Sequence, residues 1–182
     1  MVAVMAIRIG IFEQFLLATA VLTRLPVAAA APEEGAVAAA SWAFPAVGAG
    51  IGMIAGLILF VASLFGIGVA PASLLALVAA GLLTGALHED GLADTADGFG
   101  GGRDRDEKLE IMHDSRQGTY GILALILSIG LRAAALFAIG SPIDGALALI
   151  AAHAVSRSFL APAMLLLRPA GLIQNKNAIE RV

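Results

Sequence analysis

The chain of 182 residues is 59% hydrophobic and only 14% charged, with a mean hydropathy of +0.92. Ordinary soluble domains carry about 25% charged residues, so this composition indicates an integral membrane protein. The absence of cysteine excludes disulfides and thiolate metal sites. A net charge of −3 and an aromatic content of 5% argue against nucleic acid as a partner. The length predicts one domain, covering residues 1–182.

The N-terminal part of the chain is predicted to lie at the membrane surface. Residues 7–22 are apolar but slightly short for a span of about 20 residues, which favours an interfacial or re-entrant helix. Glu13 and Gln14 interrupt this run, which argues against a secretory signal peptide. Pro26 should end the segment, and residues 28–40 are expected to form an Ala-rich loop that leads into the next helix.

Four later segments are apolar enough to cross a membrane: residues 42–66, about 72–88, about 119–139 and about 143–167. Trp42 at the start of the first segment is typical of the aromatic belt at a membrane interface. Within this segment Gly48, Gly52 and Gly56 recur every four residues. Such a stripe of small residues lets a neighbouring helix approach closely.

The distribution of lysine and arginine predicts the topology. These residues occur before the first span, between the second and third, and after the fourth, whereas turns 67–71 and 140–142 contain none. Cytoplasmic segments are enriched in positive charge. We therefore predict an all-α, polytopic membrane bundle of about four transmembrane helices plus an N-terminal interfacial or re-entrant helix, with both termini in the cytoplasm.

Most of the acidic residues lie in one stretch, residues 88–121, which holds nine of the chain's 14. If the second span continues as a helix beyond His88, then Asp90, Asp94 and Asp97 share one face, within an arc of about 60°. Carboxylates beside a membrane helix are costly unless they are paired or bind a cation. Their hard oxygen ligands suit Mg²⁺, Mn²⁺ or Ca²⁺. These three aspartates are therefore predicted to bind a metal ion.

Glycines and arginines follow the aspartates directly. The run FGGGR at residues 99–103 is expected to break the helix and leave backbone N–H groups free to bind an anion. Arg103, Arg105 and Arg116 supply positive charge beside the predicted metal ligands. Carboxylates for a metal together with arginines for oxyanions are typical of a phosphoryl-transfer site. In such a site a hydroxyl attacks phosphorus while a spare carboxylate accepts its proton.

Several polar residues have a plainer interpretation. The charges at residues 104–110 fit a solvated surface helix whose apolar side is Leu109, Ile111 and Met112. His88 and His113 are either ligands, acid–base groups or boundary residues. Arg132 either extends toward the interface or forms a structural pair. His153 and Arg157, four residues apart on one helix face, either reach the cytoplasmic site or make contacts among the helices.

The central stretch resembles the signature of a known family. HEDGLADTADGFGGG at residues 88–102, followed by LEIMHDSRQGTYG at residues 109–121, is similar to the cobalamin synthase (adenosylcobinamide-GDP ribazoletransferase) family. TRLPV at residues 23–27 and WAFPAVG at residues 42–48 match the N-terminal pattern of that family, and the resemblance extends from about Phe12 to Gly171. Asp94-x-x-Asp97-Gly98 is more weakly similar to the metal motif of CDP-alcohol phosphotransferases, whose full pattern is not reproduced.

The resemblance implies a reaction. α-Ribazole, or its 5′-phosphate, would attack adenosylcobinamide-GDP, release GMP and form adenosylcobalamin or its 5′-phosphate, in the last steps of cobalamin nucleotide-loop assembly. It also implies Mg²⁺ as the cofactor and the prokaryotic cytoplasmic (inner) membrane as the location. The distribution of positive charge predicts that the catalytic loop, about residues 88–118, lies on the cytoplasmic face. A homo-oligomer or a cobalamin-assembly complex is the expected assembly.

The resemblance also implies roles for the residues that match the family motifs. The resemblance assigns the metal to the acidic motif and its neighbour, namely Glu89, Asp90, Asp94 and Asp97. Asp114, in the Asp-Ser-Arg element, would be a catalytic base or metal ligand, and Asp97 is the second catalytic candidate. Phosphate or other substrate groups would contact four arginines: Arg24, Arg103, Arg105 and Arg116.

Two other functions would also explain an acidic cluster in a membrane protein. A cation- or proton-coupled transporter would place its carboxylates in mid-membrane on broken helices, whereas here they are expected at a helix end that leads into a charged segment. A non-catalytic scaffold of a cobalamin-assembly complex would tolerate loss of Asp94 or Asp97. The polar tail, residues 172–182, departs from the family, whose members continue with further spans. We expect that a missing helix would leave the corrinoid pocket incomplete.

Overall fold

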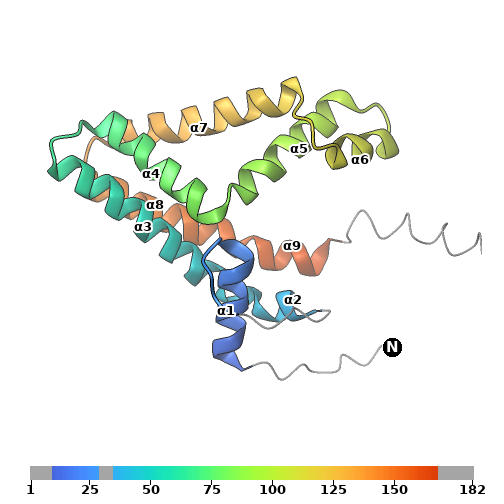
Figure 1. The fold of residues 1–182 in the computed structure, drawn as a ribbon, viewed down its shortest axis with the longest axis horizontal. Helices are drawn as coiled ribbons and strands as arrows, with labels where there is room; N and C mark the ends of the chain where they lie inside the picture. The colour runs from blue at the N-terminus through green and yellow to red at the C-terminus, as the bar shows by residue number, and fades with distance from the viewer. Residues whose placement is uncertain (1–9, 29–34, 168–182) are drawn as a thin grey trace, which may run out of the picture.

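The structure is a computed structural model that describes residues 10–28 and 35–167, and every regular element in these two segments is helical (Figure 1). This confirms the predicted all-α class. The elements are α1 (Ile11–Leu22), α2 (Ala36–Ala40), the 3-10 turn η1 (Ser41–Ala43), α3 (Phe44–Leu64), α4 (Val69–Thr84), α5 (Leu87–Gly101), α6 (Arg105–His113), α7 (Thr119–Ile139), α8 (Pro142–Ser158) and α9 (Leu160–Leu166). The predicted tail, residues 172–182, lies outside the described residues.

Three stretches are long and apolar enough to cross a membrane: Ala36–Leu64, Thr119–Ile139 and Pro142–Met164. Helices α4 and α5 together pass the same test, but they meet at an angle of 90°. The prediction of about four spans therefore holds when this bent pair counts as one. With several such helices the chain is a multi-pass membrane protein. The short apolar helix α1 packs against α2 and α3, and its predicted interfacial position stays a prediction.

The second span differs from the prediction. A continuous helix through His88 was expected, but α4 ends at Thr84 and α5 begins anew at Leu87. Gly85 and Ala86 between them both have left-handed backbone, with φ of 65° and 58°. The Ala86 N–H donates to the Gly81 carbonyl at 2.8 Å, which closes the end of α4 as in many glycine-terminated helices. Because of this bend, α5, which carries the acidic residues, runs in a different direction from α4.

The glycine stripe of α3 behaves as predicted. Helices α3 and α8 form the most extensive contact in the described part of the chain and run side by side in Figure 1. A Cβ at Gly52 would lie 2.6 Å from the Cα of Ile150, and one at Gly56 would lie 2.9 Å from the Cα of Ala146. Because side chains at these positions would collide with the α8 backbone, the glycines set the spacing of the two helices.

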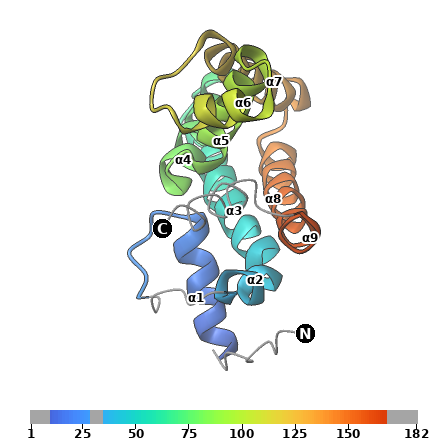
Figure 2. The ribbon, with the colours of Figure 1, turned by 90° about the vertical axis from the view of Figure 1, so that its right-hand side faces the viewer.

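The hydrophobic core lies around α3. Its largest fully buried side chains include Phe44, Leu22, Ile51 and Leu59, and many alanines fill the remaining contacts with α1, α4 and α8. By contrast, α7 is largely exposed along its apolar length, as expected of a surface that faces lipid. Helices α5 and α6 lie at the opposite side of the molecule from α1 and α2 (Figures 1 and 2).

The predicted catalytic segment, about residues 88–118, consists mainly of helices α5 and α6 rather than an irregular loop. Helix α5 packs along α7, and α6 folds back onto α5. Gly98 permits this return, because a Cβ there would meet the Met112 side chain at 2.6 Å. The acidic residues thus lie on a rigid helix that two neighbours hold in place, an arrangement that can fix the positions of reacting groups.

Candidate functional site

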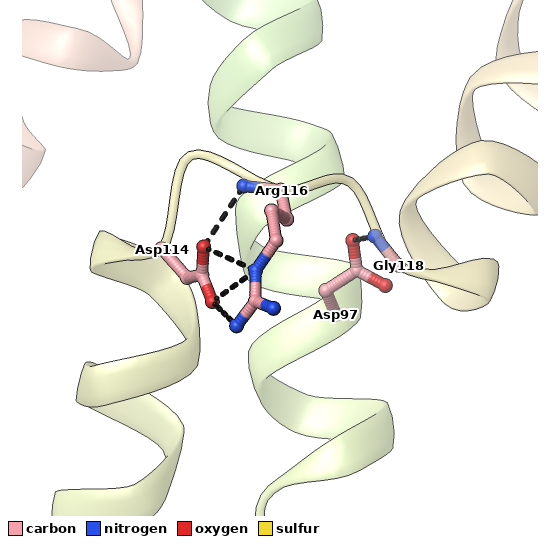
Figure 3. Close-up of polar contacts among 4 residues, drawn as sticks. All are labelled: Asp97, Asp114, Arg116 and Gly118. Atoms are coloured by element: carbon pink, nitrogen blue, oxygen red, sulfur yellow. Dashed lines mark hydrogen bonds and ion pairs between the residues drawn. The ribbon is translucent and has the colours of Figure 1, made fainter.

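Asp97 joins the acidic helix to the start of α7. Its side chain is 7% exposed, and one oxygen accepts a hydrogen bond from the Gly118 backbone N–H at 2.7 Å (Figure 3). The other oxygen accepts the Gly121 backbone N–H at 2.8 Å. The first N–H groups of a helix lack partners within it, so Asp97 caps α7 from a neighbouring helix. A Cβ at Gly118 would lie 2.7 Å from the Asp97 carboxyl carbon, so glycine is needed for this approach.

Asp114 and Arg116 form a pair on the connector between α6 and α7 (Figure 3). The Arg116 guanidinium donates to both carboxylate oxygens of Asp114 at 2.7–3.1 Å, and the Arg116 backbone N–H donates to Asp114 Oδ1 at 3.0 Å. Hydrogen bonds from Arg116 lower the pKa of Asp114 to about 2. A carboxylate with so low a pKa is a weak base, which weakens its predicted role as proton acceptor.

Asp90 and Asp94 remain available for a ligand. They lie one turn apart on α5, Asp90 exposed and Asp94 partly exposed, and neither carboxylate has a hydrogen bond or ion pair with any described residue. Mg²⁺ commonly binds one or two carboxylates together with substrate phosphates. This pair fits such an open site.

The four predicted metal ligands do not form one cluster. Across residues 10–28 and 35–167, no three His, Cys, Asp or Glu side chains lie close enough to hold a metal ion. Asp97 points to the N-terminus of α7, and Glu89 pairs with Arg132 of α7, Oε1 to Nη1 at 2.9 Å. Metal binding by Asp90 and Asp94 stays a prediction, and a cage built from all four carboxylates does not fit this arrangement.

The glycine run does not form the expected phosphate cradle. Helix α5 continues through Gly100 and ends at Gly101, so the predicted break comes later than expected. The Gly102 N–H donates to the Gly98 carbonyl at 3.0 Å, and the Arg103 N–H donates to Glu107 Oε2 at 2.8 Å. These amides are therefore occupied. The run serves instead to bring α6 against α5.

The plain surface-helix interpretation of residues 104–110 agrees with the structure. Asp104 caps α6 by accepting the Glu107 N–H at 2.9 Å, and the Glu107 side chain returns to the Arg103 N–H. The arrangement differs from a capping box, in which the glutamate would accept the N–H of the N-cap residue itself. Leu109, Ile111 and Met112 are partly buried, and Met112 and Ile111 approach α5 at Gly98 and Gly101.

The four predicted substrate-binding arginines do not converge. Arg103 and Arg105 lie at the start of α6, Arg116 lies on the next connector, and all three are exposed. The Arg24 side chain packs over Gly85 at the α4–α5 bend, and the Arg24 backbone N–H donates to the Leu83 carbonyl at 2.8 Å. Substrate contacts by these arginines stay predictions.

A second group of polar residues lies between α5, α7 and α8. Glu89, Arg132, His153 and Arg157 surround a cavity of about 300 Å³, together with His88, Leu92, Ser128, Ala152 and Ser156. Arg132 forms a structural pair with Glu89, which is one of the two roles that the sequence left open. His153 and Arg157 line the cavity together with His88 and Glu89 of the predicted catalytic segment, so both of their interpretations stay open. Sequence reasoning missed the cavity, because its parts lie 40 to 69 positions apart: His88 to Ser128 and His88 to Arg157.

Comparisons with known proteins agree on one family. A sequence model described as cobalamin-5-phosphate synthase matches residues 14–180. An adenosylcobinamide-GDP ribazoletransferase of Bradyrhizobium diazoefficiens is 52% identical over 155 residues, which are 85% of this chain and 60% of that protein. One of Mesorhizobium japonicum is 46% identical over 160 residues, 88% of this chain and 62% of the relative.

The chain thus spans about 60% of the length of these curated relatives. No solved structure is significantly similar to it. The match nevertheless covers the acidic segment, the connector to α7 and the glycine stripe of α3, and it confirms the resemblance on which the sequence interpretation rests. It also includes residues 172–180, so the prediction that the tail departs from the family is wrong. The chain belongs to the cobalamin-5-phosphate synthase family.

Proposed function

We propose that this protein is a membrane transferase that joins α-ribazole, or α-ribazole 5′-phosphate, to adenosylcobinamide-GDP with release of GMP. The observation that carries the proposal is the family match over residues 14–180, together with relatives named adenosylcobinamide-GDP ribazoletransferase. We place the protein in the prokaryotic cytoplasmic membrane with α5 on the cytoplasmic face, because its connecting segment carries the basic residues. A homo-oligomer or a cobalamin-assembly complex is the proposed assembly.

The reaction exchanges a phosphoanhydride bond for a phosphate ester bond. A hydroxyl of α-ribazole forms a new O–P bond at the cobinamide-side phosphorus of the diphosphate. The bond from that phosphorus to the bridging oxygen breaks, GMP leaves with the electron pair, and the hydroxyl proton passes to a base or to water. Charge accumulates on the leaving phosphate, so the site needs positive charge beside the diphosphate.

We propose that Asp90 and Asp94 hold Mg²⁺. Both carboxylates are free on one face of a rigid helix, which supports the assignment. When bound, the ion would neutralise charge on the diphosphate. Arg116 is the proposed phosphate contact on the connector, and Asp114 would orient its guanidinium through their 2.7–3.1 Å hydrogen bonds. Asp97, whose oxygens accept two amides, would position α7 and the connector relative to Asp90 and Asp94.

The test is direct turnover by the purified chain in detergent. Adenosylcobinamide-GDP and α-ribazole 5′-phosphate are mixed with the protein, and GMP is measured by chromatography with Mg²⁺ or with EDTA. We expect GMP release only with Mg²⁺, and a loss of about 100-fold or more in Asp94→Asn, since a metal contributes several kcal/mol to such a transition state. Asp106→Asn, on the exposed side of α6, is the matched control and should keep full activity.

GMP release that persists in EDTA would remove Mg²⁺ from the proposal. No GMP release under any condition, together with cation- or proton-coupled uptake into liposomes, would replace the transferase with a transporter. If Asp90→Asn and Asp94→Asn both turned over like the unaltered chain, the metal would have to be held by other residues.

A further inference from the structure

The polar cavity between α5, α7 and α8 has more positive charge than its own side chains compensate. Arg132 is paired, since it donates to Glu89 at 2.9 Å. Arg157 is 7% exposed, and its described partner is the Ser156 hydroxyl at 2.8 Å. No carboxylate within residues 10–28 and 35–167 forms an ion pair with it. The cavity therefore has one buried cation more than it has anions.

Three buried nitrogen atoms that line the cavity also lack hydrogen-bond partners: Nε of Arg157, Nδ1 of His88 and Nδ1 of His153. More than nine-tenths of buried polar groups in proteins have a partner, so three such atoms in one place need an explanation. A neutral imidazole can donate a hydrogen bond from one ring nitrogen, and the guanidinium can only donate. The unused groups are thus suited to an acceptor with several oxygens.

The charge and the size of the cavity favour an anion over ordered water alone. A buried charge without a counterion is strongly unfavourable, particularly along a helix that spans a membrane. Water would satisfy the hydrogen bonds but would leave the charge of Arg157 uncompensated. The volume of about 300 Å³ is about ten times the share of one water molecule. Guanidinium groups bind either phosphate or carboxylate with two parallel hydrogen bonds, and a phosphate has further oxygens that can accept from the two histidines.

The cavity is separate from the proposed metal ligands. Residues on α5 advance by about 100° each, which puts His88 and Leu92 about 160° from Asp90 and Asp94 around the helix axis. His88 and Leu92 lie on one side of α5, and Asp90 and Asp94 lie on another. The buried residues Ala93 and Asp97, which face α7, lie between these two sides. A group bound in the cavity would therefore lie on the opposite side of α5 from Asp90 and Asp94.

We propose that this cavity binds a phosphate group, held by the Arg157 guanidinium with His88 and His153 as further hydrogen-bond donors. Phosphate monoesters, inorganic phosphate and the headgroup of an anionic phospholipid share the required chemistry. The inference does not depend on the transferase reaction, and its test uses binding rather than turnover. The two proposals can therefore fail independently.

The experiment follows thermal unfolding of the full chain in an uncharged detergent, with phosphate-free buffer and EDTA. The soluble probes are inorganic phosphate, α-ribazole 5′-phosphate and unphosphorylated α-ribazole. A separate arm adds phosphatidylglycerol or, as its uncharged counterpart, phosphatidylcholine. We expect at least one anionic phosphate probe to raise the melting temperature in a saturable way, and α-ribazole and phosphatidylcholine to have no effect. Stabilisation by phosphatidylglycerol alone would identify the source as lipid.

Two variants test the role of Arg157. In Arg157→Met the affinity for the stabilising probe should fall about tenfold to hundredfold, the effect of losing a charge-assisted hydrogen bond. Lys108→Met removes a positive charge outside the cavity, over the Phe99 ring, and should leave the affinity unchanged. Without any probe, Arg157→Met should melt no lower than the unaltered chain, because it removes an unpaired buried charge.

Three results would overturn the proposal. No response to any phosphate probe would show that the cavity holds water only. An unchanged affinity in Arg157→Met would place the phosphate elsewhere. A lower melting temperature of Arg157→Met without probe, with no change in the response to phosphate, would make Arg157 a purely structural residue.

Discussion

The Asp97 carboxylate accepts the backbone N–H of Gly118 at 2.7 Å, although the two residues belong to different elements. Asp97 lies on α5, and Gly118 is the N-cap of α7. This contact and the one to Gly121 join the acidic helix to a predicted span. An aspartate that the motif suggested as a metal ligand thus has a clear role in fixing the position of α7.

Asp97→Asn should destabilise the protein. Asparagine keeps one acceptor oxygen, but its NH₂ group would face an N–H donor, so one buried amide loses its partner. Loss of such a bond costs about 1–3 kcal/mol. We expect a lower midpoint of unfolding in a denaturant titration monitored by circular dichroism, and reduced activity as a consequence.

The matched comparison is Asp90→Asn, on the same helix but exposed and without a described partner. Its stability should stay within about 0.5 kcal/mol of the unaltered chain, whereas its activity should be lost. If Asp97→Asn proved as stable as Asp90→Asn, the capping role of Asp97 would be wrong.

The ion pair between Asp114 and Arg116 should make the stability of the folded state depend on pH. Hydrogen bonds from Arg116 lower the pKa of Asp114 from its ordinary value of 3.8 to about 2. A depressed pKa stabilises the folded state above the ordinary pKa, and this contribution is lost as the pH falls toward about 2. Arg116→Gln should return the Asp114 pKa toward 3.8, which carboxyl-carbon NMR with labelled aspartate can measure.

The same pair bears on catalysis. Because Asp114 stays ionised far below neutral pH, it cannot be the group whose protonation ends activity near neutrality. The acid limb of the pH–rate profile should therefore keep its midpoint in Arg116→Gln, while the rate should fall if Arg116 makes the proposed phosphate contact. An acid limb that moves upward in this variant would return Asp114 to the role of base.

Local patterns in the sequence predicted the parts of the fold that depend on local interactions. The Gly48-x-x-x-Gly52-x-x-x-Gly56 spacing predicted a close helix neighbour, and α8 is that neighbour. The charges at residues 104–110 predicted a surface helix, and Asp104 caps it. Both features involve residues within one or two helical turns of each other, where spacing alone fixes which side chains share a face.

The parts that sequence could not predict depend on contacts between distant segments. Nothing near Asp97 shows that Gly118, 21 residues later, will donate to it. Arg157 and His88 likewise line one cavity only because the fold brings α8 and α5 to the same place. The α4–α5 bend is an intermediate case, since Gly85 after an apolar helix is a recognisable C-terminal signal. The hydrophobic residues on both sides of Gly85 favoured a continuous span instead.

The α4–α5 bend can be tested by single substitutions of Gly85 and of Ala86. Gly85→Ala would place a side chain at φ 65° and against Arg24, so we expect a loss of about 1–2 kcal/mol. Ala86→Gly removes the same strain at φ 58° and should be neutral or stabilising by up to about 1 kcal/mol. Denaturant unfolding of the two variants measures both changes in the free energy of unfolding. Equal destabilisation by both would show that the left-handed backbone at this bend is not retained.

Helix α3 offers the sharpest test of packing, because it contains tight and open glycines one turn or less apart. A Cβ at Gly52 would lie 2.6 Å from the Cα of Ile150, whereas one at Gly50 would meet nothing within 4 Å. Backbone atoms of α8 cannot yield as a flexible side chain would, so Gly52→Ala must push the two helices apart. We expect a loss of about 1–3 kcal/mol, the usual cost of overpacking.

Gly50→Ala is the control for helix propensity, since it makes the same chemical change in the same helix. It should be neutral or stabilising by up to about 1 kcal/mol, because alanine is the better helix former. The two variants are compared by unfolding in mixed micelles with increasing SDS. Because α8 also carries His153 and Arg157, moving it away from α3 should weaken phosphate binding in Gly52→Ala but not in Gly50→Ala. Equal stability of the two variants would mean that α3 and α8 are farther apart in the membrane than the glycine contacts require.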